Sequence, residues 1–367
     1  MKIQNWVGVL CVGLAIGSSV AQEADDLSEL LKNKLEGSHL PALSAAVIVD
    51  GKLKAQGAAG VRKKGDETAV TANDKFHIGS CTKSMTATLA AILVEDGLIE
   101  WDSTIGEVLE ELPMKEGYRD ATLRQLLAHT AGFPTQVPPP IWMVAWQMKG
   151  ELAAQRRLFA KLMLDQEPSY QSGEGWEYSN TGYTVAGVML EEVTGKAWED
   201  LMQERLFKPL GMKSAGFREP ASEGKVDQPW GHHLSTKPEP PGRKADNPNA
   251  IAPAGVVHCS MEDLARYVRF HSLKETGTVL KQAESFDTLH EVVAEKENYA
   301  LGWKVVDRGW AKGKALTHGG SNGMWATVMW LAPERDFAVV VSSNIAMSVA
   351  AKPMDDIAAA LIETYLD

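Results

Sequence analysis

The sequence contains few cysteines. Only three of its 367 residues are cysteine, and Cys11 lies in an apolar N-terminal stretch. The other two, Cys81 and Cys259, allow at most one disulfide. A Cys81–Cys259 disulfide and two buried free thiols are both compatible with these positions.

Long apolar runs and an excess of basic residues are also missing. After residue 21 no stretch approaches the roughly 18 consecutive apolar residues that a membrane-spanning helix needs. The formal net charge at pH 7 is −11. This acidic balance argues against nucleic acids and anionic membrane surfaces as partners. We therefore expect no nucleic-acid binding and no membrane span.

Histidines with the spacing of metal ligands are absent as well. The sequence has no His-x-His or His-Glu-x-x-His, and its one close histidine pair is His232-His233. Adjacent side chains on a strand or helix point apart, so this pair is poorly placed to share an ion. We expect surface-loop histidines there, and we expect neither a metal nor another cofactor.

The N-terminus has the three parts of a secretory signal. Lys2 supplies the positive charge, residues 6–16 the apolar stretch, and Ser19-Val20-Ala21 a small-residue cleavage site. The apolar stretch is too short to span a membrane. We therefore expect residues 1–21 to be removed and the protein to be exported, either to a periplasm or out of the cell.

Strand patterns occur at both ends of the remaining chain, with helical patterns between them. The expected strands are 43–49, 52–60, 299–306, 314–318, 324–331 and 337–343, and the expected terminal helices are 25–37 and 350–365. Two separated groups of strands can share one sheet if the helical middle is inserted as a second lobe. We therefore predict an α/β fold of the α+β type with an antiparallel sheet. It forms a single domain over 22–367, with a sheet lobe (about 25–70 and 251–367) and an all-helical lobe (about 71–250).

The most informative stretch is Ser80-Cys81-Thr82-Lys83. It opens a run with apolar residues at helical spacing, so Lys83 rises from the same face as Ser80, whereas Cys81 is turned away. Burial lowers the pKa of a lysine amine towards neutrality, and a neutral amine can take the proton of a serine hydroxyl. Ser-x-x-Lys alone is a weak signal, because a capping serine before a surface lysine gives the same pattern.

Two further motifs follow in a recognisable order. Tyr178-Ser179-Asn180 lies in a loop before a helical pattern, and His318-Gly319-Gly320 ends a predicted strand. With Ser80-x-x-Lys83 they resemble the serine β-lactamase and penicillin-binding-protein superfamily, and in detail its class C-like branch, where Tyr-x-Asn replaces Ser-Asp-Asn. The resemblance covers nearly all of the mature chain, including residues 123–132, 253–260, 263–265 and 301–303.

The resemblance implies a role for each motif residue. Ser80 matches the acylated nucleophile, Lys83 its proton partner, and Tyr178 the general base that passes a proton to the leaving group. Asn180 matches the side chain that steadies Lys83 and the substrate amide. The backbone N–H groups of Ser80 and Ser321 match the two oxyanion donors. A phenol beside an ammonium is also expected to have a lowered pKa, so Tyr178 could act close to neutrality.

The third motif departs from the lactamase pattern. Class C β-lactamases carry Lys-Thr-Gly where this sequence has His318-Gly319-Gly320, which we expect to bind substrate together with Ser321. A histidine at this place is similar to certain D,D-peptidases, D-aminopeptidases and family VIII-type esterases. A permanently charged lysine suits a substrate carboxylate better than a neutral histidine does. His318 can therefore anchor a carboxylate only as an imidazolium, and otherwise it joins the hydrogen-bonding network of Lys83 and Tyr178.

These features predict an exported serine hydrolase that forms an acyl-enzyme at Ser80 from a small-molecule or peptide substrate with an ester or amide bond. A β-lactamase is one alternative. A penicillin-binding sensor or scaffold that is acylated without turnover is the other. The resemblance extends only to acyl transfer, because one site in this superfamily serves peptidases, esterases and lactamases.

Three other patterns have a weaker connection with function. Residues 319–323 fit the Gly-x-Ser-x-Gly elbow of α/β-hydrolases, but a strand pattern follows and no histidine occurs after His318, so the triad cannot form. His129, near a helix end, is expected to be structural. Trp142 and Trp146 lie in a proline-led insert, and they are expected either to wall the acyl-binding cleft or to pack in the core of the helical lobe.

Overall fold

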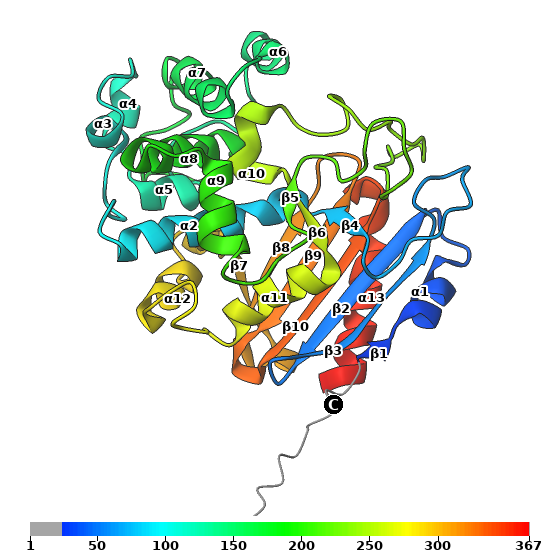
Figure 1. The fold of residues 1–367 in the computed structure, drawn as a ribbon. Coiled ribbons are helices and arrows are strands. Elements are labelled where there is room, and N and C mark those ends of the chain that lie inside the picture. Colours follow the sequence, from blue (N-terminus) through cyan, green and yellow to red (C-terminus); the bar gives the residue numbers. More distant parts are fainter. Residues whose placement is uncertain (1–23, 367) are drawn as a thin grey trace, which may run out of the picture.

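The computed structural model describes residues 24–366, and Figure 1 shows their arrangement. The predicted signal, residues 1–21, lies outside the described residues. One seven-stranded sheet has the order β1-β3-β2-β10-β9-β8-β7. It is antiparallel except for β1, which pairs in parallel with β3. Its strands are β1 (Asp25–Asp26), β2 (Ala42–Val49), β3 (Lys52–Gly60), β7 (Lys304–Arg308), β8 (Gly313–Gly320), β9 (Ala326–Ala332) and β10 (Phe337–Ser343).

The α/β class and the sheet shared by the two ends of the chain confirm the sequence prediction. β2 and β10 are buried almost throughout, which explains why both read as continuous apolar runs rather than as alternating patterns. Alternate residues still serve two different cores. Ala46 and Ile48 point into one, whereas Ala45 and Val47 point into the other.

Helices cover both faces of this sheet (Figure 1). α1 (Ser28–Leu35) and α13 (Met347–Leu366) pack on one face, and α11 (Met261–Ser272) packs on the other. α2 (Thr82–Glu95) runs into the helical part of the molecule, where it contacts α8, α10 and α12. The remaining helices are α3 (Ile105–Val108), α4 (Glu116–Arg119), α5 (Leu123–Leu127), α6 (Pro139–Gln147), α7 (Leu152–Leu164), α8 (Asn180–Thr194), α9 (Trp198–Met202), α10 (Ala252–Gly255) and α12 (Ala283–His290).

A second, smaller sheet was not anticipated from the sequence. β4 (Lys75–His77), β6 (Val257–Ser260) and β5 (Gly216–Phe217) form it, so the inserted segment contains short strands beside its helices. Strands of two to four residues are too short for an alternating pattern to be read from the sequence. β4 leads directly into the turn that carries Ser80, and its pairing with β6 fixes the direction of that turn.

None of the helices within residues 24–366 combines the length and the apolar character that crossing a membrane requires.

Two glycines let the end of β8 lie against the turn before α2. A Cβ atom added at Gly320 would lie 1.9 Å from the carbonyl oxygen of Ile78, and one added at Gly79 would lie 2.2 Å from the backbone nitrogen of Ser321. Gly79 also has a φ of 51°, which disfavours residues with side chains. The contact is therefore between two backbones, and only glycine fits at these two positions.

We predict that Gly320→Ala lowers the free energy of unfolding by about 1–3 kcal/mol, because the added methyl group forces two backbone segments apart. Denaturant unfolding of the purified protein measures this change. Gly309→Ala is the matched control, since a Cβ atom there meets nothing within 4 Å. Equal unfolding midpoints for the two variants would contradict the close backbone contact.

Candidate active site

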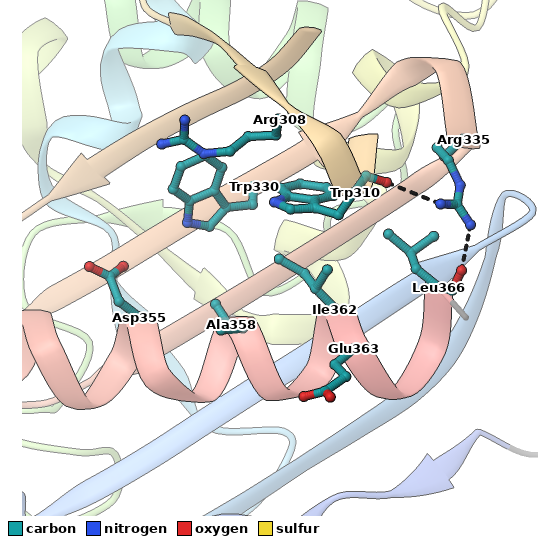
Figure 2. A pocket seen from close by; sticks show the side chains of 10 residues that line it. Arg308, Trp310, Trp330, Arg335, Asp355, Ala358, Ile362, Glu363 and Leu366 are labelled. Atoms are coloured by element: carbon teal, nitrogen blue, oxygen red, sulfur yellow. Dashed lines mark hydrogen bonds between the residues drawn. The ribbon is translucent and has the colours of Figure 1, made fainter. Parts of the chain in front are cut away.

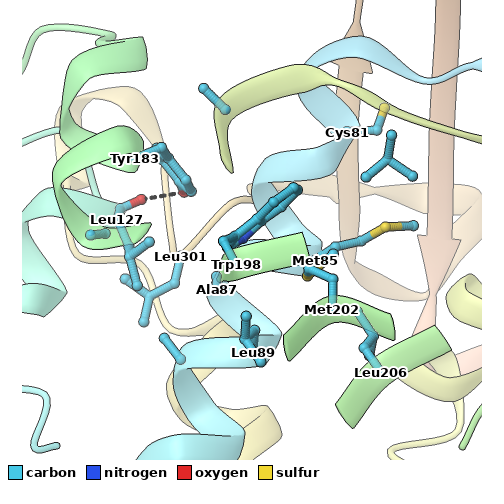
Figure 3. Close-up of a cluster of buried hydrophobic side chains, with 14 of the residues drawn as sticks. Cys81, Met85, Ala87, Leu89, Leu127, Tyr183, Trp198, Met202, Leu206 and Leu301 are labelled. Carbon is cyan, nitrogen blue, oxygen red and sulfur yellow. Dashed lines mark hydrogen bonds between the residues drawn. The ribbon is translucent and has the colours of Figure 1, made fainter. Parts of the chain in front are cut away.

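Ser80 lies in a single 3-10 turn, Gly79–Cys81, that continues into α2. Residues 82–93 of α2 are all buried, so the helix is surrounded by protein rather than amphipathic. Figure 3 shows side chains from α5, α8 and α9 packed around it, among them Leu127, Tyr183 and Trp198. This burial carries Lys83 into the interior with its side chain fully covered.

The amine of Lys83 has three polar neighbours. Its Nζ atom donates hydrogen bonds to Asn180 Oδ1 at 2.7 Å and to the carbonyl oxygen of Ala254 at 2.8 Å, and it lies 3.2 Å from Ser80 Oγ. A neutral amine has two N–H groups and one lone pair. The two carbonyl-type oxygens satisfy its N–H groups, and its lone pair is then free to accept the proton of the Ser80 hydroxyl. The surroundings therefore fit the deprotonated amine.

Burial lowers the pKa of Lys83 to about 7. This confirms the direction predicted from the apolar helix. An amine with such a pKa is partly neutral at neutral pH and can serve as a general base there.

Tyr178 lies beside the same amine, with Lys83 Nζ 4.8 Å from the centroid of the phenol ring. Burial raises the pKa of Tyr178 well above its usual range, and a hydrogen bond with the Ser80 side chain opposes this to a smaller extent. The predicted lowering of the Tyr178 pKa is therefore wrong. It considered only the charge of an ammonium beside the phenol, whereas the loss of hydration of the partly buried phenol has the larger effect on its pKa, and the amine itself loses its proton easily. Tyr178 is thus a neutral phenol in the resting site.

His318 is buried, and both of its ring nitrogens are engaged. Nδ1–H donates to the carbonyl oxygen of Gly319 at 2.8 Å, and Nε2 accepts a hydrogen bond from the Tyr299 hydroxyl at 3.1 Å. Burial, and secondly the charge of Lys83, lower the pKa of His318 to about 3. The imidazolium needed for a carboxylate anchor is therefore disfavoured. The neutral, hydrogen-bonding alternative fits this environment.

His129 contacts the backbone and the tyrosine ring of the Tyr178-Ser179-Asn180 motif. Its Nδ1 accepts a hydrogen bond from the backbone N–H of Ser179 at 3.1 Å, and its ring centroid lies 4.4 Å from that of Tyr178. The residue has a φ of 64°, a left-handed conformation that places the ring under the motif. The structural role expected for His129 is thus a specific one, because it positions the backbone between Tyr178 and Asn180.

Asp246 connects the two segments that carry the backbone N–H groups of Ser80 and Ser321. His77 accepts a hydrogen bond from the Gly79 N–H at 3.1 Å through Nδ1 and donates to Asp246 at 2.9 Å through Nε2. The other Asp246 oxygen accepts from the Asn322 side chain at 3.0 Å. One buried carboxylate therefore holds the turn before α2 and the turn after β8 together.

Three of these contributors have no recognisable signal in the sequence. Asp246 lies in a segment rich in proline, glycine and charge that resembles a surface loop. Ala254 acts through its carbonyl oxygen, which no residue pattern reveals, although residues 253–260 belong to the resemblance. Tyr299 could be placed beside His318 only by knowing that the two lie together in the folded chain.

Three sequence expectations about other residues can now be compared with the structure. Cys81 and Cys259, the cysteines within residues 24–366, are both buried free thiols, so the disulfide alternative is not realised. Burial raises the pKa of the Cys81 thiol, which leaves it unreactive. The surface position expected for His232 is wrong. Its ring is fully buried, donating to the Asn344 carbonyl and accepting from the Lys64 N–H, so two backbone partners satisfy it.

A cavity of about 390 Å³ opens at the nucleophile. Among the described residues, its lining is Ser80, Gly319, Gly320, Ser321, Val328, Met347, Ala351, Met354 and Asp355. Neither Trp142 nor Trp146 contributes to it, and Trp142 packs against the larger hydrophobic core. The core position, one of the two alternatives for these tryptophans, is therefore the one that Trp142 adopts.

The comparisons with known proteins agree with this arrangement. The family model described as Beta-lactamase matches residues 27–364, so the chain belongs to the β-lactamase family. It is 30% identical to penicillin-binding protein 4 of Amycolatopsis lactamdurans, an alignment that covers 76% of this chain and 71% of that protein. It is 26% identical to the unguisins hydrolase ungD' of Aspergillus campestris over 88% of this chain, which spans only 62% of that hydrolase.

Solved structures share the same fold. The SurE crystal structure superposes with a TM-score of 0.75 at 25% identity, covering 92% of this chain and 75% of SurE. A D-stereospecific amidohydrolase from Streptomyces sp. superposes with a TM-score of 0.69 at 21% identity, covering 90% of this chain and 96% of the amidohydrolase. The chain is thus a member of a superfamily that contains penicillin-binding proteins and hydrolases on one fold.

We predict that acylation becomes faster as pH rises through about 7, because Lys83 must lose its proton before it can accept one from Ser80. An aliphatic ester and a carboxylate-bearing substrate should share this profile, since His318, with a pKa of about 3, stays neutral throughout. Stopped-flow acylation between pH 5 and 9 measures both profiles. If the acylation rate fell above pH 6 for the carboxylate-bearing substrate alone, and His318→Lys restored that rate, His318 would be an imidazolium anchor instead.

Proposed function

We propose that this chain is an exported serine hydrolase that cleaves an ester or amide bond through an acyl-enzyme at Ser80. One observation supports this above the others. The Lys83 amine is buried, lies 3.2 Å from the serine oxygen, and has both of its N–H groups engaged by other acceptors. The lone pair of the neutral amine is therefore available to accept the proton of the Ser80 hydroxyl.

In the proposed reaction, Lys83 removes the hydroxyl proton as Ser80 Oγ forms a bond to the substrate carbonyl carbon. The backbone N–H groups of Ser80 and Ser321 stabilise the negative charge on the carbonyl oxygen. The bond to the leaving group then breaks, and the proton held by Lys83 reaches that group through the Tyr178 hydroxyl. A water molecule then gives a proton through Tyr178 to Lys83 while its oxygen bonds to the acyl carbon. The bond between that carbon and Ser80 Oγ breaks, Lys83 returns the proton to Ser80 Oγ, and the acid is released.

The neutral state of His318 favours a substrate without a carboxylate at this position. The lining of the cavity beside Ser80 is largely apolar and includes the side chains of Val328, Met347 and Met354. An uncharged ester is therefore favoured over a carboxylate-bearing peptide or a β-lactam. Amide cleavage is a second candidate, because relatives and structural neighbours include an unguisins hydrolase and a D-stereospecific amidohydrolase.

Export is part of the proposal and rests on the charged, apolar and small-residue parts of residues 1–21. Cleavage after Ala21, detected by mass spectrometry of the protein purified from its own cells, is the direct test.

We predict that a fluorophosphonate labels the wild-type protein at Ser80 and does not label Ser80→Ala. Lys83→Ala should slow labelling by about a hundredfold or more, because the serine then lacks its base. Intact-protein mass spectrometry measures both, with thermal unfolding as the control for folding. Labelling that persists in Ser80→Ala would contradict the assignment, and labelling without turnover of any ester or amide would favour the sensor or scaffold alternative.

We predict that Tyr178→Phe slows deacylation at least as much as acylation, because the neutral phenol relays protons in both half-reactions. The variant keeps the ring that packs on His129, so its fold should be intact. Single-turnover kinetics on an aliphatic ester separate the two steps. Unchanged rates for both steps would exclude a proton-relay role for Tyr178.

A further inference from the structure

A second cavity lies on the side of the sheet covered by α13, away from Ser80. It has a volume of about 470 Å³ and is formed by α13, β7, β9 and the turns beside them. In Figure 2 the rings of Trp310 and Trp330 lie above the helix, facing Ala358 and Ile362. The guanidinium of Arg308 stacks over Trp330, 5.4 Å from the ring centroid. Nothing in the proposed reaction uses these residues.

The two cavities adjoin along one face of α13. Both are lined by Asp355, and the other helix residues that line them follow each other in steps of three or four: Met347, Ala351, Met354, Ala358 and Ile362. Residues at this spacing form one stripe on a helix. The facing strand shows the same continuity, because Val328 in the first cavity and Trp330 in the second are two positions apart on β9 and point to the same side.

The stripe is long. From Met347 to Ile362 the helix rises by about 22 Å at the usual 1.5 Å per residue. The two cavities together therefore form a groove that begins at the nucleophile and ends at the two tryptophans. We call it the α13 groove, and define it by the residues of these two cavities.

The chemistry of the α13 groove suits a hydrocarbon chain better than a peptide. β9, which contributes Val328 and Trp330 to the groove, is paired on both edges, by β8 and β10, so along the groove it offers a bound peptide no strand to pair with. A buried peptide would then leave its N–H and C=O groups without partners, which is costly, whereas a hydrocarbon chain has no such groups. The part of the wall between α13 and β9 is apolar, whereas the charged residues Arg308, Asp355 and Glu363 are exposed at the rim. The fourth charged residue, Arg335, is occupied by the carbonyl oxygens of Trp310 and Leu366.

We infer that the substrates of this chain carry a long, uncharged hydrocarbon chain, which lies in the α13 groove while the ester carbonyl reacts at Ser80. This inference rests on the proposed function and specifies its substrate class. The chain can belong to the acid or to the alcohol of the ester, because both are attached at the reacting carbonyl.

The first test compares two ester series in the wild-type protein: acetyl, hexanoyl and dodecanoyl esters of one short alcohol, and acetate esters of ethanol, hexanol and dodecanol. Burial of the added methylene groups should raise kcat/KM by about tenfold or more from the shortest to the longest member of one series. The series that responds identifies which side of the ester occupies the groove. A flat response in both series, with the short esters still hydrolysed, would overturn the inference while leaving the proposed function intact.

Ala351→Phe fills the groove near its middle and should abolish the gain from chain length, measured within the variant as the ratio of kcat/KM for the longest and the shortest ester of the series that responds in the wild type. Ala360→Phe is the matched control, because residue 360 lies half a turn away around the helix and outside the lining of either cavity. Trp330→Ala, at the far end of the groove, should reduce kcat/KM for the twelve-carbon ester and leave kcat/KM for the shorter esters unchanged. An unchanged chain-length profile in both Ala351→Phe and Trp330→Ala would overturn the inference.

A binding measurement separates the groove from the chemistry. Isothermal titration of Ser80→Ala with the long-chain ester, below its micelle concentration, should show one saturable site that Ala351→Phe weakens by tenfold or more. Binding to Ser80→Ala in a protein whose wild type hydrolyses neither an ester nor an amide would support the groove and contradict the proposed function. Absence of binding would overturn the groove.

Discussion

The interior position of one amine governs the chemistry of the region around it. Lys83 lies on a helix that is buried over residues 82–93. Because a charge in the interior is costly, burial favours the deprotonated amine and lowers its pKa. When Lys83 is charged, it disfavours further positive charge nearby, and this contributes to the lowered pKa values of His129 and His318. The site therefore holds two neutral imidazoles, a neutral phenol and one amine that can change its charge. Lys83 is therefore the member of this group whose charge changes near neutral pH.

Most of the sheet could be predicted from the sequence because its signals are local. The apolar runs of β2 and β10 and the pattern of the closing helix depend on neighbouring residues. The motif residues Ser80, Lys83, Tyr178 and Asn180 were found through their order in the chain, and the structure brings three of them together at the Lys83 amine.

What escaped prediction depends on tertiary packing. Burial reversed the expected direction of the Tyr178 pKa, and it is not visible in a single sequence position. Asp246 bonds to His77, which lies 169 residues earlier in the chain, and Tyr299 bonds to His318 from a loop. The α13 groove combines residues of a helix and of strands that only the folded sheet brings face to face. Membership of the family did not supply these features either, since one fold serves different substrates.

The contact between Gly79 and Gly320 has a consequence for when the protein can first react. The two amides that would stabilise the oxyanion come from the early and the late part of the chain, and β8 reaches the first turn of α2 only after the C-terminal strands have joined the sheet. During synthesis the N-terminal part emerges first, with its serine and lysine but without the second amide. The complete pair of amides therefore exists only after β8 has been synthesised and has joined the sheet, so the geometry of this site depends on completion of the fold.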